Sequence, residues 1–328
     1  MPDQTRTRRV AALAKAARAA VLLPTLFALL TLLLHNPQAA GFSVFGTFAH
    51  LVMTNYAEAQ RQRILQSLTV TLAGAAMIAW GTAVSTHLLL AVLSASIVAF
   101  ATRAAAHSIG LLASIHTVVL LAFMLAVTAP APLTHILPRL AGWLLSGIIS
   151  LPILLITWIS LNTQSPPDPQ PYLNSTTHTN LVSLAAPTRA AVAMAIAVLI
   201  AGLFHLEHGF WLVLGILPVL RSADTVPRTF LQEQAGTLTG VALSALFVGA
   251  RHTIYWVAPA AFIAAYLASV GIFLAGQAAF TFFVVVLLNI LAPIEYSAGL
   301  QRLTAIAFGG AISLLTGTLY STQRTHVS

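Results

Sequence analysis

Charged residues are scarce in this sequence, and their scarcity excludes a water-soluble fold. Only 7% of the 328 residues are charged and 58% are hydrophobic, whereas soluble domains carry about 25% charged residues. So few charges could not cover the surface of a soluble domain of this size. Cysteine is absent altogether, which excludes disulfides, thiolate catalysis and cysteine-bound metals. The solvent that suits this composition is lipid.

What the sequence does have is one apolar run after another. A helix needs roughly 20 apolar residues to span the hydrocarbon core of a bilayer. The runs favour Leu, Ala, Val and Ile without period-2 alternation, which indicates helices and not a β-barrel. We therefore predict an all-α, polytopic transmembrane helix bundle. Its twelve expected spans lie near residues 18–34, 40–55, 67–84, 87–102, 108–129, 140–160, 187–206, 208–220, 235–250, 253–270, 273–291 and 301–320.

A single polar linker divides the spans into two sets of six. It is rich in Pro, Ser, Thr and Asn, and it gives three predicted segments: a first membrane half at 1–160, a linker at 161–186 and a second membrane half at 187–328. The net charge of +8 comes from arginines at span ends, which is typical of topology control and not of nucleic-acid binding. Placing both termini and the linker in the cytoplasm puts most of these arginines inside. We expect the first helix to stay uncleaved.

Short segments of the first half recur in the second half in the same order. The matched pairs are 18–21 with 189–192, 41–42 with 209–210, 65–74 with 231–240, and 139–151 with 302–314. Six helices per repeat would give both repeats the same orientation, related by a pseudo-twofold axis along the membrane normal. Such repeats commonly build a path or a site at their interface. The alternative is that a duplication only enlarged the bundle.

The second half also carries a recognisable series of motifs. His208–Leu214 reads HGFWLVL, Gly236–Gly240 reads GTLTG, and an arginine precedes two glycines in the last span, at Leu300–Gly310. This series resembles the fusaric-acid-resistance-like family of bacterial inner-membrane proteins, also called the aromatic acid exporter family. The resemblance implies export of aromatic or other organic acids, in several members together with a periplasmic adaptor protein. Many members have a large cytoplasmic domain, where this chain has only its short linker.

The candidate substrate-binding residues are mostly arginines and aromatics. Arg139 and Arg302 occupy matching places in the two halves and could attract a carboxylate passing between them; the alternative is snorkelling to lipid head groups or pairing with Glu295. Phe210 and Trp211 begin one of two short spans that each start at a Gly-Phe pair, a pattern that indicates a binding site or only close helix packing.

Three further candidates lie nearer the cytoplasm or within the other short span. Arg221 and Arg228 could recruit an anion at the inner mouth, or could only fix topology. His50, which lies in one of the two short spans, could relay protons, although a hydrogen-bonded packing role is favoured over a relay. Glu233 is expected in the cytoplasmic loop beside these arginines. No metal or cofactor site is expected.

These observations favour a transporter that exports organic anions, in particular aromatic carboxylates, across the inner membrane. No enzymatic activity is expected, because no phosphate-binding motif and no nucleophile or metal cluster has a recognisable spacing. Two alternatives stay open: a non-transporting subunit of an efflux complex, and a membrane-embedded lipid enzyme. Flux through the purified chain would separate the first alternative from the transporter, and lipid turnover would support the second.

Overall fold

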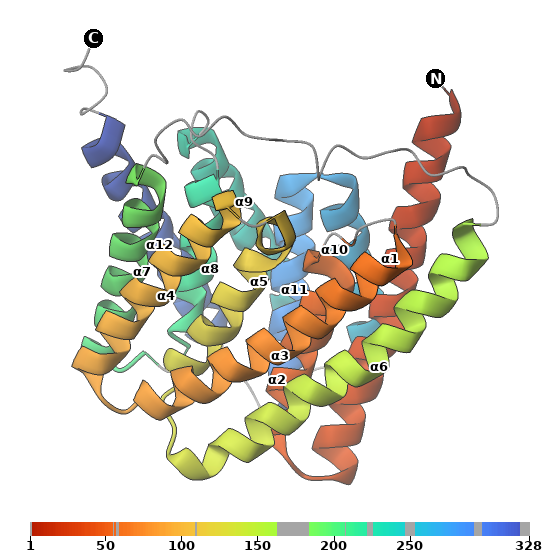
Figure 1. The fold of residues 1–328 in the computed structure, drawn as a ribbon, viewed down its shortest axis with the longest axis horizontal. Coiled ribbons are helices and arrows are strands. Elements are labelled where there is room, and N and C mark those ends of the chain that lie inside the picture. Colours follow the sequence, from red (N-terminus) through yellow and green to blue (C-terminus); the bar gives the residue numbers. More distant parts are fainter. Residues whose placement is uncertain are drawn as a thin grey trace.

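Helices make up almost all of the described chain. In the computed structural model the described residues are 2–54, 56, 59–108, 110–162, 184–206, 208–221, 226–246, 253–291 and 297–321, and none of them lies in a strand. The all-α prediction is confirmed. The twelve helices of this part of the chain are α1 (Pro2–Ala28), α2 (Pro37–Phe48), α3 (Gln60–Val84), α4 (Leu88–Ser108), α5 (Gly110–Val127), α6 (Ile136–Asn162), α7 (Ala185–Leu203), α8 (Phe210–Arg221), α9 (Val226–Ala245), α10 (Val257–Val270), α11 (Phe273–Leu291) and α12 (Ser297–Ser321) (Figure 1).

The outer surface of the bundle is apolar. Leu72, Leu89 and Leu246 are each more than 60% exposed, which is typical of side chains that face lipid. Within the described residues, five helical segments are long and apolar enough to cross a membrane, and three shorter apolar helices accompany them. The five are Arg9–Leu33, Gln60–Val84, Leu88–Ala106, Leu133–Ile156 and Ala185–Leu203. The chain is therefore a membrane protein built of helices.

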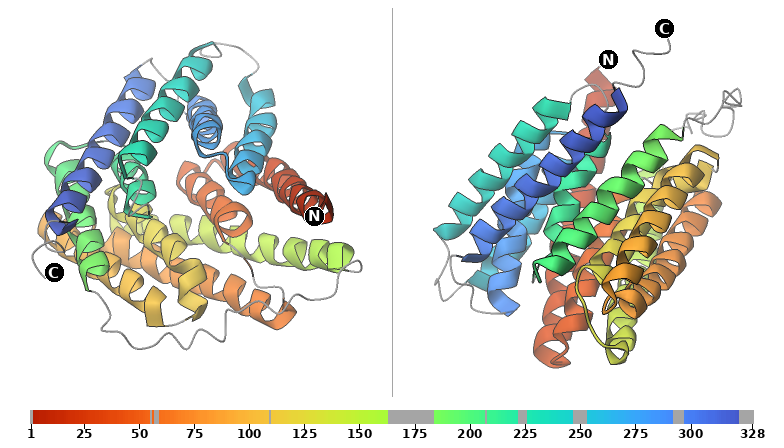
Figure 2. Two further views of the ribbon diagram at one scale, coloured as in Figure 1. Left: turned by 90° about the horizontal axis from the view of Figure 1, so that it is seen from above. Right: turned by 90° about the vertical axis from the view of Figure 1, so that its left-hand side faces the viewer.

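Helix packing in the first half recurs in the second half. Helix α2 packs on α6 as α8 packs on α12, and α3 packs on α5 as α9 packs on α11. The first helix of each half instead packs on the fourth helix of the other half, α1 on α10 and α7 on α4. Helices α1 and α12 begin and end, respectively, on the same side of the bundle (Figures 1 and 2).

The connection between the first and second helices of each half has the same unusual backbone. His35, which follows the first helix, has φ +49°, and His205, at the matching place in the second half, has φ +48°. Left-handed backbone is uncommon outside glycine, although histidine adopts it more often than most residues. Asn36 then caps α2, because its side-chain oxygen accepts a hydrogen bond of 3.0 Å from the Ala39 amide. The two halves thus share backbone detail as well as packing.

The two short spans expected from the sequence are short helices in the structure. Helices α2 and α8 each have 12 residues, too few to cross a bilayer alone. A π-helical turn, Ala49–Met53, extends α2, and such turns are frequent at functional sites. Helix α1 begins at Pro2, upstream of the expected start of the first span near residue 18, and the segment long and apolar enough to cross a membrane is Arg9–Leu33. The linker expected at 161–186 lies largely outside the described residues.

Glycines allow the closest helix contacts. A Cβ at Gly309 of α12 would collide with the carbonyl of Leu212 on α8, and one at Gly142 of α6 would collide with the carbonyl of Ala39 on α2. A Cβ at Gly236, in the GTLTG motif, would lie 2.6 Å from the Leu274 carbonyl of α11. Small residues at such crossings let helix backbones approach in a membrane. The glycines of this motif therefore have a packing role.

Substituting one of these glycines should destabilise the bundle. Gly309→Ala forces α8 and α12 apart, so the expected cost is about 1–3 kcal/mol and the temperature of thermal unfolding in detergent should fall. Gly41→Ala is the matched control, because nothing lies within 4 Å of the position that its Cβ would take. Equal unfolding temperatures for the two variants would contradict the close approach of α8 and α12.

Candidate functional site

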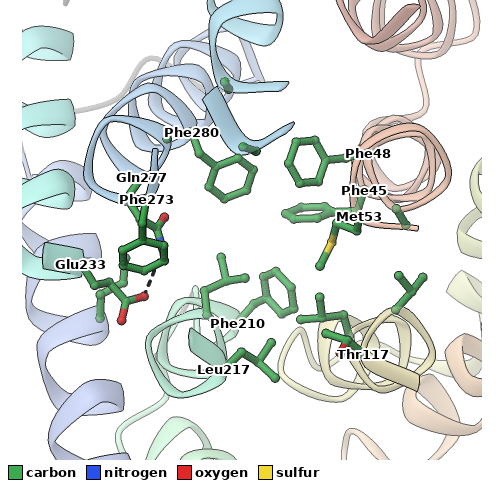
Figure 3. A pocket seen from close by; sticks show the side chains of 18 of the residues that line it. Phe45, Phe48, Met53, Thr117, Phe210, Leu217, Glu233, Phe273, Gln277 and Phe280 are labelled. Atoms are coloured by element: carbon green, nitrogen blue, oxygen red, sulfur yellow. Dashed lines mark hydrogen bonds between the residues drawn. The ribbon is translucent and has the colours of Figure 1, made fainter. Parts of the chain in front are cut away.

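A cavity of about 530 Å³ lies at the centre of the bundle. Helices from both halves surround it: α2, α5 and α6 on one side and α8 to α12 on the other. The two short helices both contribute, α2 and its π-helical turn with Phe45, Phe48 and Met53, and α8 with Phe210 and Leu217 (Figure 3). Cavities of about 300–1,000 Å³ hold small-molecule ligands in proteins.

Aromatic rings cover much of the cavity wall. Phe45 of α2 meets Phe210 of α8 edge-on, with ring centroids 5.1 Å apart. Phe48, one turn along α2, lies 5.0 Å from Phe280 of α11. Both contacts join the first half of the chain to the second (Figure 3). Offset and edge-on geometries are the favoured arrangements of aromatic rings, so a planar ring could be accommodated among these side chains.

Arg302 brings a positive charge to this apolar cavity. The residue is 1% exposed and lines the cavity from α12. Its guanidinium carbon lies 5.4 Å from the ring of Trp211 and 5.6 Å from that of Phe280. Its Nε and Nη2 reach Thr281 Oγ1 only at 3.4 Å, and its buried Nη1 has no hydrogen-bond partner among the described residues. A buried donor without a partner is costly, and a bound anion would supply the missing acceptor.

Glu233 lies in the same cavity, which corrects the prediction that placed it in a cytoplasmic loop. Helix α9 begins at Val226, so position 233 falls within the helix and faces inward, with the residue 1% exposed. Its Oε1 accepts a hydrogen bond of 3.4 Å from Gln277 Nε2, while its Oε2 has no partner in the described part of the chain (Figure 3). Glu233 and Arg302 interact electrostatically. The described lining of the cavity therefore includes one buried acidic side chain and one buried basic side chain.

Arg139, the first-half counterpart of Arg302, is placed differently. It is also 1% exposed, but it does not line the cavity. Its guanidinium donates to Gln38 Oε1 at 3.0 Å and Thr82 Oγ1 at 3.1 Å, and to the carbonyls of Ala126 at 3.3 Å and Ala129 at 2.7 Å. These carbonyls lie at the C-terminal end of α5, where a helix has unsatisfied acceptors and favours a cation. The structure thus brings only Arg302 of this pair into the cavity, and neither arginine reaches the outer surface.

The other predicted residues divide between the cavity and its surroundings. Phe210 lines the cavity, and Trp211 lies behind it beneath Arg302. His50 is fully buried beside the cavity, where its ring nitrogens lie 3.1 Å from Tyr56 Oη and 3.3 Å from Thr71 Oγ1. Arg228 is exposed at the start of α9. Arg221 ends α8, and its side chain lies outside the described residues.

A protein-family model matches most of the second half of the chain. The matching family model is described as "Fusaric acid resistance protein-like", and the match covers residues 195–316. The second half is similar to this family. The resemblance predicted from the HGFWLVL and GTLTG motifs is thus confirmed for that half. Searches of curated proteins and of solved structures found no match. The apolar helices indicate a membrane protein, and the family match shows that most of its second half is similar to the fusaric acid resistance family.

Several cavity residues had no signal in the sequence. Phe45, Phe48 and Phe280 are apolar residues among apolar residues, and a membrane helix that is hydrophobic all round has no polar face to show which side points inward. Glu233 did have a signal, because an acidic residue within a membrane helix is rare and usually functional. The sequence prediction missed this signal because it began the span at residue 235, whereas α9 begins at Val226.

Proposed function

We propose that this chain is a transporter that carries aromatic carboxylic anions out of the cell across the bacterial inner membrane. The observation that carries the proposal is the buried guanidinium of Arg302, whose Nη1 lacks a partner among the described residues, in the wall of an aromatic cavity of about 530 Å³. A guanidinium matches a carboxylate in charge and geometry. The surrounding phenyl rings would hold the apolar body of the ligand.

The matching helix contacts in the two halves of the chain support a path between those halves. The recurrent packing pairs and the paired His35 and His205 conformations are what two tandem six-helix repeats would produce. The cavity lies between the halves, and the two short helices α2 and α8 meet there. Paired short or interrupted helices mark the substrate sites of transporters built from repeats. Both termini would lie in the cytoplasm, in keeping with an even number of crossings.

Flux through the purified chain in proteoliposomes tests the transport proposal. Benzoate and larger aromatic carboxylates should show saturable flux, and aliphatic carboxylates of similar size should be carried more slowly because they lose the contacts with the rings. Flux by this chain alone would also show that an adaptor protein is not required. Absence of flux for every carboxylate, with folded protein, would favour a non-transporting subunit.

Filling the cavity should block this flux. Ala268 lines the cavity from α10, and its side chain is exposed to the open space. Ala268→Phe should therefore reduce benzoate flux at least about tenfold, because the new ring occupies volume that the ligand needs. Ala76→Phe on the exposed face of α3 is the matched control, since it adds the same bulk where lipid is expected. Equal flux through both variants would move the path away from this cavity.

A further inference from the structure

The cavity wall contains an acidic and a basic side chain, Glu233 and Arg302, that do not hydrogen-bond to each other. Glu233 Oε2 and Arg302 Nη1 are both buried and both lack a hydrogen-bond partner within the described residues, although the two side chains interact electrostatically. Arg302 could therefore donate a hydrogen bond to a bound anion, and Glu233 could bind a proton. Unpartnered polar atoms buried in an apolar site are expensive, so their persistence in the cavity wall indicates that both are used when the cavity is occupied.

Among the described side chains on the helices that pack against α9, Arg302 is the one whose charge can compensate that of Glu233. Helices α8, α11 and α12 pack on α9. Helix α11 has no titratable side chain and presents Gln277 to Glu233, while the titratable residues of α12 are Arg302 and, near the end of the helix, Tyr320. The only charged residue of α8 is Arg221, its last residue. Among the described side chains, Arg302 is therefore the charge that balances Glu233.

An anion that enters the cavity disturbs this balance. With Glu233 ionised, the two side chains carry no net charge, and a bound carboxylate would leave one uncompensated negative charge in an apolar environment. Two carboxylates that share one site do not both stay ionised without a large cost. A proton on Glu233 removes that cost, because the guanidinium then faces a single negative charge, that of the ligand.

We propose that Glu233 takes up a proton from solvent whenever the cavity binds an anion at Arg302, so that proton and anion occupy the site together. The proposal rests on the proposed function and extends it to a coupled ion. Binding of the two ligands is then reciprocal: each raises the affinity for the other. Anion affinity falls as pH rises through the range in which Glu233 ionises, by up to about tenfold per pH unit for one proton per anion.

Within its described residues, the first half of the chain carries no second site of this kind. The matching of residues 65–74 with 231–240 places Ser67 opposite Glu233, and the counterpart arginine, Arg139, is already hydrogen-bonded to four protein acceptors. Among the described residues the proposal therefore gives the proton a single binding site, and the expected stoichiometry is one proton to one anion.

Calorimetry with benzoate on the purified full-length chain tests this coupling. Benzoate stays ionised between about pH 6 and pH 9, so its own titration does not interfere. Titrations in two buffers with different ionisation enthalpies measure the protons taken up per anion. Wild type should take up close to one proton, with an affinity that falls as pH rises. Glu233→Asp should keep both properties, because it keeps a carboxyl group.

Glu233→Gln gives the decisive comparison, since its amide is neutral like a protonated carboxyl group. It should bind benzoate without proton uptake, at an affinity that does not change with pH and exceeds that of wild type at the alkaline end. Proton uptake that persists in Glu233→Gln would overturn the proposal and assign the proton to another group, such as one of the histidines. Benzoate binding by wild type without proton uptake would also overturn it, yet leave the transport proposal standing. No benzoate binding by wild type at any pH would reject both.

Discussion

Arg302→Gln is expected to weaken benzoate binding by about 10- to 150-fold and to reduce flux correspondingly. The substitution removes the charge but keeps a hydrogen-bonding side chain of similar length. A hydrogen bond to a charged group contributes about 1.5–3 kcal/mol, and each 1.4 kcal/mol is a factor of about ten in affinity. The cavity itself should survive, because the hydrogen bonds of Arg302 to described residues are two of 3.4 Å, both to Thr281.

Two further variants make the Arg302 result interpretable. Arg302→Lys keeps the positive charge as a point charge and should retain part of the affinity, although it cannot form the two parallel hydrogen bonds of a guanidinium. Arg228→Gln removes an exposed arginine at the start of α9 and should leave binding unchanged. Calorimetric affinity and proteoliposome flux should change together. If all three variants bind benzoate as wild type does, the anion is held elsewhere.

The sequence predicted the fold class well, because long apolar runs have few structural solutions in lipid. The expectation of about twelve helices follows from that composition, and the described residues contain twelve α-helices. The positions of helix ends were less predictable. Helix α1 continues through the charged segment at Arg6–Lys15 to Pro2, where hydropathy alone indicates a cytoplasmic tail. The same uncertainty at the start of α9 placed Glu233 outside the bundle.

The candidate site was only partly predictable, for a related reason. The matching sequence segments drew attention to Arg139 and Arg302 as a pair, but sequence matching cannot show which acceptors surround a side chain. Arg139 lies over Phe42, with its guanidinium carbon 5.0 Å from the ring centroid, as Arg302 lies over Trp211. Their remaining contacts differ: protein acceptors surround Arg139, whereas Arg302 opens onto the cavity. Two arginines at matching places in the sequence thus have different surroundings in the structure.

Arg139→Leu is expected to lower the free energy of unfolding by about 3 kcal/mol or more, because four acceptors, two of them buried and two half-buried, lose their donor at once. The arginine donates hydrogen bonds to the Gln38 amide oxygen, the Thr82 hydroxyl and the carbonyls of Ala126 and Ala129. Each buried polar group left unsatisfied costs about 1–3 kcal/mol. These bonds tie α6 to the end of α5, to α3 and to α2, so their loss should loosen the packing of the whole first half.

Comparison with Arg302→Leu separates the structural role of Arg139 from a role in binding. Leucine at 302 removes a buried charge that has few hydrogen-bond partners among the described residues, and Glu233 can then take up a proton, so that no uncompensated charge is left in the cavity. Thermal and denaturant unfolding in detergent should therefore show a large loss for Arg139→Leu and a small change for Arg302→Leu. Benzoate binding should show the reverse order once the Arg139 variant is measured well below its unfolding temperature. If Arg139→Leu is as stable as wild type but does not bind benzoate, Arg139 belongs to the anion path, and the two arginines act as a pair.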